Sequence, residues 1–193
     1  MKEYYYDNLI FEGEYLNGQK YGKGKEYNYN KLIYEGEYLN GQRSGKGKEY
    51  NYNKLIFEGE YLNGLRWKGK GKEYHDNGKI SFEGEFLNGQ RNGKGKKYYI
   101  DGNLAFEGEF LNGQRNGKGK EYYNNGNLAF EGEYFNGKRN GQGNLYYNNK
   151  LIFEGEYLNG KRWNGKEYKN NKLIFEGEYL NGEKNGKGKE YKK

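Results

Sequence analysis

A five-residue string, [FY]-E-G-E-[YF], recurs eight times along the 193 residues and constrains the fold more than any other feature. Successive copies begin 22 to 25 residues apart. This spacing is regular enough for a tandem repeat and too short for a strand–helix–strand unit, which needs about 30 residues or more. We therefore expect an array of small units, each stabilised by its neighbours. The copies begin at Phe11, Tyr34, Phe57, Phe82, Phe106, Phe130, Phe153 and Phe175.

Each repeat contains two extended stretches separated by turn residues. In the repeat that begins at Tyr34, the stretches cover residues 32–39 and 45–50, and residues 40–44 connect them. This connection begins with Asn-Gly, which favours a β-hairpin because both residues accept a positive φ. The return connections, such as Asp101-Gly102-Asn103, are also turn-like. The whole chain is expected to be a meander of about sixteen short antiparallel strands.

The alternation of side chains gives each hairpin two different faces. A register with Leu39 opposite Lys46 sets Tyr38 opposite Gly47 and Glu37 opposite Lys48. One face is then aromatic and glycine, and the other consists mostly of paired opposite charges. The first face contains Tyr34, Gly36, Tyr38, Gly45 and Gly47, and the second contains Glu35, Glu37, Leu39, Lys46 and Lys48.

Composition indicates how such a chain can fold without a thick core. Only 32% of the residues are hydrophobic, yet 19% are aromatic, which distinguishes the chain from disordered segments. Aromatic rings can lie across the bare backbone of strand glycines and compensate for the missing side chains. We therefore expect a single-layer antiparallel sheet that spans residues 1–193. It comprises a half-repeat cap (residues 1–10), eight repeats (11–191) and a short tail (192–193).

The pattern [FY]-x-G-x-[YF]-x-N-G-x-x-x-G-x-G resembles the MORN (membrane occupation and recognition nexus) repeat, and FEGEFLNGQRNGKG at Phe82 shows it complete. The resemblance implies an elongated, twisted, single-layer antiparallel sheet with a groove along one face. In the family this groove holds protein segments, serves cytoskeletal or membrane-adjacent complexes, and in some cases binds acidic phospholipids. Two repeats depart from the pattern. The third has an extra residue after its Asn-Gly and contains Trp67, and the seventh is one residue short and contains Trp163.

Catalysis has little support in the sequence. There is one histidine and no cysteine, so thiolate chemistry and thiolate metal sites are excluded. A Glu-Gly-Glu carboxylate pair would suit a glycosidase, but a pair present in every repeat opposite lysine is better explained as a structural charge ladder. We expect no enzyme activity and no cofactor. The absence of a signal sequence and of a long apolar stretch predicts a cytoplasmic protein, and the resemblance implies association with the cytoskeleton or a membrane.

Three sets of residues are candidates for binding. The second aromatic of each repeat is predicted to line a groove for a protein partner, while the two tryptophans are predicted interface anchors that also allow a homodimer. The alternative function is attraction of acidic phospholipids by a basic stripe in the hairpin loops, given a net charge of +7. Nucleic acid is not expected. The groove residues are Tyr15, Tyr38, Tyr61, Phe86, Phe110, Tyr134, Tyr157 and Tyr179; the anchors are Trp67 and Trp163; the stripe is Arg43, Arg66, Arg91, Arg115, Arg139 and Arg162.

Overall fold

A computed structural model describes residues 1–191, and all of its regular elements are β-strands. It contains no helix that is long and apolar enough to span a membrane within these residues. Consecutive strands pair antiparallel as an open meander, so the predicted fold class is confirmed. The strands are β1 (Lys2–Tyr5), β2 (Asn8–Leu16), β3 (Gln19–Asn28), β4 (Lys31–Leu39), β5 (Gln42–Asn51), β6 (Lys54–Leu62), β7 (Leu65–Tyr74), β8 (Ile80–Leu87), β9 (Gln90–Tyr98), β10 (Leu104–Leu111), β11 (Gln114–Tyr122), β12 (Leu128–Phe135), β13 (Lys138–Tyr147), β14 (Lys150–Leu158), β15 (Lys161–Lys169), β16 (Lys172–Leu180) and β17 (Glu183–Glu190).

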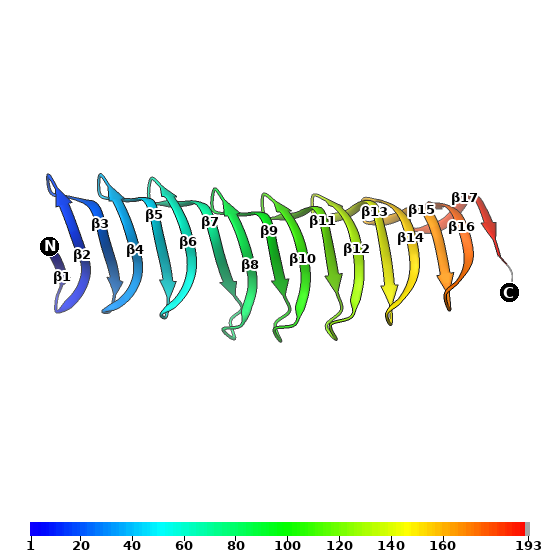
Figure 1. The fold of residues 1–193 in the computed structure, drawn as a ribbon, viewed down its shortest axis with the longest axis horizontal. Coiled ribbons are helices and arrows are strands. Elements are labelled where there is room, and N and C mark those ends of the chain that lie inside the picture. Colours follow the sequence, from blue (N-terminus) through cyan, green and yellow to red (C-terminus); the bar gives the residue numbers. More distant parts are fainter. Residues whose placement is uncertain (192–193) are drawn as a thin grey trace. The chain divides into compact units, whose positions relative to one another are not determined.

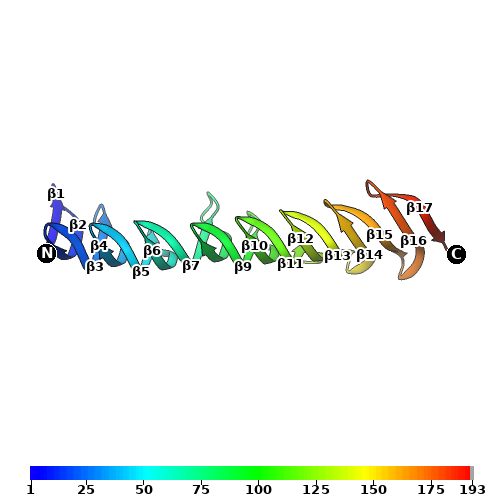
Figure 2. The same cartoon turned by 90° about the horizontal axis from the view of Figure 1, so that it is seen from above.

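The strands belong to two compact units. Unit 1 consists of Met1–Tyr74 with Glu83–Asn92, and unit 2 consists of His75–Phe82 with the chain from Gly93 onward. In unit 1, each strand from β1 to β7 pairs with the next in chain order, and the strands of this unit lie side by side in both views (Figures 1 and 2). In unit 2, the strands from β9 to β17 pair in the same way.

The hairpin turn is tighter than the sequence predicted. Asn40 and Gly41 have φ values of 50° and 78° and form a two-residue turn, because β5 already begins at Gln42. The predicted register is therefore wrong. Gly36 lies opposite Gly47, and Tyr38 lies opposite Arg43. The partner of Gly47 is thus two residues from the predicted one, Tyr38. Because this shift is even, every side chain stays on its predicted face of the sheet.

The aromatic face is the core of the protein. The first aromatic ring of each repeat is buried, and those of the first seven repeats have 0% of their surface exposed. The Tyr34 ring lies over Gly36 and Gly47, whose missing side chains leave room for it. It also makes edge contacts with Tyr38 and Tyr61 at centroid distances of 5.5 and 5.0 Å. Rings and glycines share one face, as predicted. However, the glycine pair of this repeat is covered by its first ring, Tyr34, and not by its second ring, Tyr38.

Candidate functional site: a glycine-floored channel

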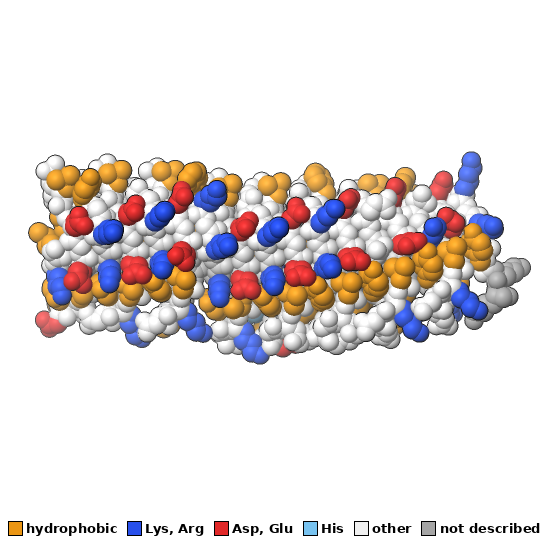
Figure 3. Space-filling view, in the orientation of Figure 1, with side chains coloured by type: hydrophobic (Ala, Val, Ile, Leu, Met, Phe, Trp, Pro, Cys, Tyr) orange, Lys and Arg blue, Asp and Glu red, His pale blue; other side chains and the backbone are white. Residues whose placement is uncertain are grey.

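The opposite face of unit 1 carries a channel of about 850 Å³ that crosses the strands β2 to β7. Its floor is the backbone of one glycine from each strand after β2: Gly24, Gly36, Gly47, Gly59 and Gly69. Two charged rows form its walls, and Figure 3 shows them as alternating acidic and basic side chains separated by a band of backbone. The hairpin-side row is Lys23, Glu37, Lys46, Glu60 and Lys68, and the return-side row is Glu12, Lys25, Glu35, Lys48 and Glu58.

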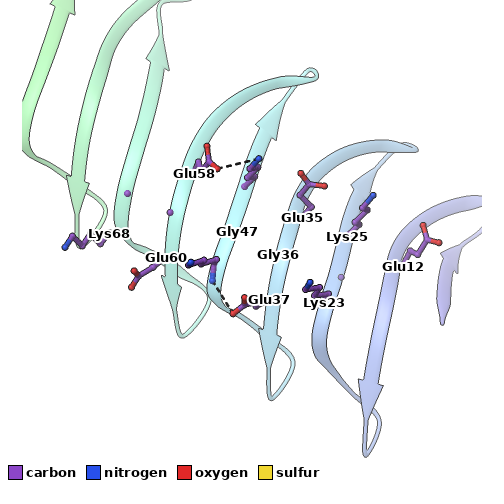
Figure 4. Close-up of a pocket in the computed structure, with 15 residues that line it drawn as sticks. Glu12, Lys23, Lys25, Glu35, Gly36, Glu37, Gly47, Glu58, Glu60 and Lys68 are labelled. Carbon is purple, nitrogen blue, oxygen red and sulfur yellow. Dashed lines mark hydrogen bonds and ion pairs between the residues drawn. The ribbon is translucent and has the colours of Figure 1, made fainter.

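The alternation of charge follows from the repeat itself. One strand of each hairpin carries Glu-Gly-Glu, and the other carries two lysines around a glycine. Because the glycines pair with one another, Lys46 lies opposite Glu60 and Lys48 lies opposite Glu58. Each strand therefore places like charges on both walls, and the next strand places the opposite charge there (Figure 4).

Few of these charges are bound to each other. In the return-side row, Lys48 Nζ lies 3.5 Å from the Glu58 carboxylate. Across the described residues, no ion pair within 4 Å involves a member of the hairpin-side row, whose five side chains are all exposed. The charge ladder predicted from the sequence exists in the register, but on this wall its charges form no ion pair among the described residues, and Glu37 Oε2 accepts a hydrogen bond from the Lys46 backbone N–H at 3.4 Å (Figure 4).

Apolar side chains form a rim beyond each wall. Leu16, Leu39 and Leu62 are each about half exposed and follow the hairpin-side row on strands β2, β4 and β6. Beyond the return-side row, Tyr50 pairs with Leu55 across strands β5 and β6. Figure 3 shows hydrophobic side chains outside both charged rows. Along the strand direction, this face therefore consists of an apolar rim, a charged row, the glycine floor, a second charged row and a second apolar rim.

The tyrosine of the return-side rim was missed by the sequence analysis. Tyr50 donates a hydrogen bond from its hydroxyl to Glu35 Oε1 at 2.6 Å. Burial and this carboxylate raise the pKa of Tyr50 to about 12, so the hydroxyl remains a donor at neutral pH. The same bond recurs in unit 2 from Tyr122 to Glu107 and from Tyr146 to Glu131. The sequence signal for this hydrogen bond is a tyrosine that directly follows the last charged residue in the second strand of most repeats, such as Tyr50 and Tyr122.

The aromatic residues predicted to line a partner groove lie in the core instead. Seven of the eight are only 3–4% exposed, and Tyr15 is partly exposed. Those of unit 1 lie on the face opposite the channel, and in both units neighbouring rings and Arg–Glu pairs cover these residues. Because seven of the eight rings are buried, a partner could touch almost none of their surface in this structure.

The six arginines of the predicted basic stripe lie within strands, not in exposed loops, so that placement is wrong. Arg43 illustrates the arrangement. Its guanidinium lies 4.3 Å from the centroid of the Tyr34 ring and is hydrogen-bonded to Glu26. Each of the others also pairs with a glutamate. Lipid binding through these arginines stays a prediction, but their charges are already matched inside the protein.

The Arg–Glu ladder makes stability sensitive to acid. Burial favours the neutral form of Glu121, but the hydrogen bond and charge of Arg139 outweigh it, so the pKa of Glu121 lies below its usual range. Since the folded pKa is lower than the unfolded one, Glu121 stabilises unit 2 above about pH 4.3, and this stability is lost as the pH falls through the folded pKa. Urea denaturation from pH 7 to pH 3 should show the loss, and Glu121→Gln should flatten the profile. An equally steep profile in the variant would contradict this account.

The two tryptophans occupy the same position in two unusual hairpins. In repeat 3, Tyr61 pairs with Arg66 and Glu60 pairs with Lys68, so Trp67 is a single extra residue in the strand. Trp163 stands at the same point of repeat 7, between paired residues Arg162 and Asn164. Both repeats lack the glycine that has a positive φ at this point elsewhere, such as Gly45. The tryptophans are 40% and 47% exposed, and their role as anchors stays a prediction.

Comparison with known families supports this repeat structure. The family profile described as MORN repeat matches six segments that together cover more than half of the chain: residues 11–31, 34–54, 82–104, 106–128, 130–151 and 175–193. The two repeats outside these segments are the two that contain the tryptophans. No curated protein matches the chain. MORN repeats are scaffolds that bind proteins or membranes without catalysing a reaction. The chain belongs to the MORN repeat family.

Proposed function

We propose that the protein is a non-catalytic scaffold that binds a segment of a partner protein in the channel of unit 1. The observation that carries this proposal is the hairpin-side row. Five exposed charges of alternating sign stand beside a bare glycine floor, and they make no ion pairs with one another or with other described residues. Surface charges left unpaired in this way can pair with a ligand that brings the opposite pattern.

The charge balance of the channel favours a protein over a lipid surface. Five lysines and five glutamates line it, so the two signs cancel. Attraction to an anionic membrane grows with the number of uncompensated Lys and Arg residues near the surface, at about 1 kcal/mol each. A balanced channel offers little of this attraction. An interface with another protein, in contrast, gains specificity from signs that alternate.

Peptide selection on the full chain tests this proposal. Peptides selected from a random displayed library are expected to bind the wild-type chain and to lose at least about tenfold in affinity for Lys46→Trp/Glu60→Trp, because the bulky rings fill the channel. Lys31→Trp, at the exposed first residue of β4 outside the channel, is the matched control and should bind normally. If the double variant binds all selected peptides as tightly as the wild type does, the channel is not the binding site.

A further inference from the structure

We infer that the segment bound in the channel is an α-helix with a stripe of charges that alternate in sign every three to four residues. This inference rests on the proposed function and adds the conformation and charge pattern of the partner. It is carried by the spacing of the charged rows and by the apolar rims outside them.

The spacing along the rows suits a helix and not an extended chain. Neighbouring strands lie about 4.8 Å apart, so the sign of the charge reverses at that interval along each wall. Residues three and four apart on a helix are separated by about 4.5 and 6.0 Å along its axis, which bracket this interval. Residues on one side of an extended chain are separated by about 6.6–6.8 Å, so they fall out of step by about 4 Å after two positions.

The sign of each partner residue follows from the strand that it faces. A basic residue is expected opposite Glu37 and Glu60, and an acidic residue opposite Lys23, Lys46 and Lys68. Six strands span about 24 Å, which corresponds to about 16 helical residues. The structure therefore specifies both the length and the order of charges of the partner stripe.

The rims explain why the helix should also be apolar on both flanks of its charged stripe. Leu39 and Leu62 stand outside the hairpin-side row, and Tyr50 with Leu55 stands outside the return-side row. Each rim lies two residues, about 6.6–6.8 Å, beyond its charged row along the strands, so long apolar side chains on the two flanks of a helix that rests on the rows extend toward the rims. Burial of apolar flanks supplies affinity, while the alternating charges fix the register of the helix along the channel.

The corresponding face of unit 2 keeps the alternation from β9 to β12, where lysines lie opposite glutamates, but loses it from β13 onward. Gln142, Asn144 and Asn164 stand where lysines stand in unit 1, and they pair with Glu156, Glu154 and Glu178. From β12 to β16, this face therefore has glutamates without the intervening lysines at these three places. The alternation is unbroken over the six strands β2 to β7 in unit 1 but over only the four strands β9 to β12 in unit 2, so the helix with the alternating stripe is expected to bind unit 1.

Two labelled 18-residue peptides of identical composition test the inference by fluorescence anisotropy with the full chain. Both are helical and have the same apolar flanks, but one carries the alternating stripe and the other groups its acidic and basic residues in two blocks. The alternating peptide should bind at least tenfold more tightly. Equal affinity of the two peptides, or no binding of the alternating peptide, would overturn the inference.

A charge swap in the protein provides the second arm. Glu60→Lys/Lys68→Glu keeps the net charge but breaks the alternation of the hairpin-side row. This swap should lower the affinity for the alternating peptide about tenfold. The matched control is Lys118→Glu/Glu133→Lys, which swaps an opposed pair in unit 2 and should change nothing. Thermal melts establish that both variants fold. Unaltered binding by the first swap would also overturn the inference.

The two proposals fail in different ways. If the displayed library yields peptides that depend on the channel but lack the stripe or remain extended when bound, only the helix inference fails. If no selected peptide depends on the channel, the proposed function itself fails. Circular dichroism of the bound peptides separates helical from extended ligands.

Discussion

Replacement of Phe130 by alanine is expected to lower the free energy of unfolding of unit 2 by about 3–5 kcal/mol, the usual cost of removing a fully buried phenylalanine. None of the Phe130 side chain is exposed. The ring contacts Tyr134 and Tyr157 at centroid distances of 5.6 and 5.1 Å, and the Arg139 guanidinium lies 4.2 Å from its centroid. A single-layer sheet has no second layer that could collapse into the resulting cavity.

The loss can be measured by urea denaturation followed by circular dichroism. Phe135→Ala is the matched control, because Phe135 lies on the same strand and is 58% exposed, so its removal should cost less than about 0.5 kcal/mol. Hydrogen exchange should show the largest loss of protection in β12 to β15, since each repeat of an array is stabilised mainly by its neighbours. Similar costs for the two variants would show that the aromatic face is not the core.

The face of each side chain could be predicted from the sequence, because alternation along a strand has a period of two and requires no long-range information. The register could not. Gly45 has a φ of 61° and, with Lys46, lies between the paired residues Ser44 and Gly47. This irregularity depends on backbone conformation at one glycine, and an Asn-Gly turn alone is compatible with several loop lengths.

The site was harder to predict than the fold. From the sequence, the rings on one face of a single-layer sheet are expected to be accessible to a partner, because the sequence does not show which residues cover them. Arg43 lies opposite Tyr38, so its guanidinium reaches the aromatic face and closes it together with Glu26 and Glu49. Only the true register reveals this contact. The same register places the glycine floor between two charged rows on the opposite face, where the side chains of the hairpin-side row are exposed.

The floor itself should not tolerate a single added methyl group. A Cβ on Gly36 would point toward the aromatic face, where it would lie 2.6 Å from the carbonyl oxygen of Lys46, 2.6 Å from the Cα of Gly47 and in collision with the Tyr34 hydroxyl. Two of these contacts are with backbone atoms of the paired strand, which cannot move without disturbing the ladder. Gly36→Ala is therefore expected to lower the free energy of unfolding of unit 1 by about 3 kcal/mol, at the upper end of the usual cost of overpacking.

Gly41→Ala separates this packing effect from the conformational preference of glycine. Gly41 has a φ of 78°, and a Cβ there would meet nothing within 4 Å, so the cost should be only the strain of the left-handed conformation, about 1 kcal/mol. Urea denaturation of the two variants compares them directly. Because Gly36 pairs with Gly47 under the Tyr34 ring, a larger effect at Gly36 means that the close approach of the two backbones and the covering ring leaves no room for a side chain. Equal effects would mean that the glycines are needed for backbone freedom alone, and that the aromatic face has room for a side chain at Gly36.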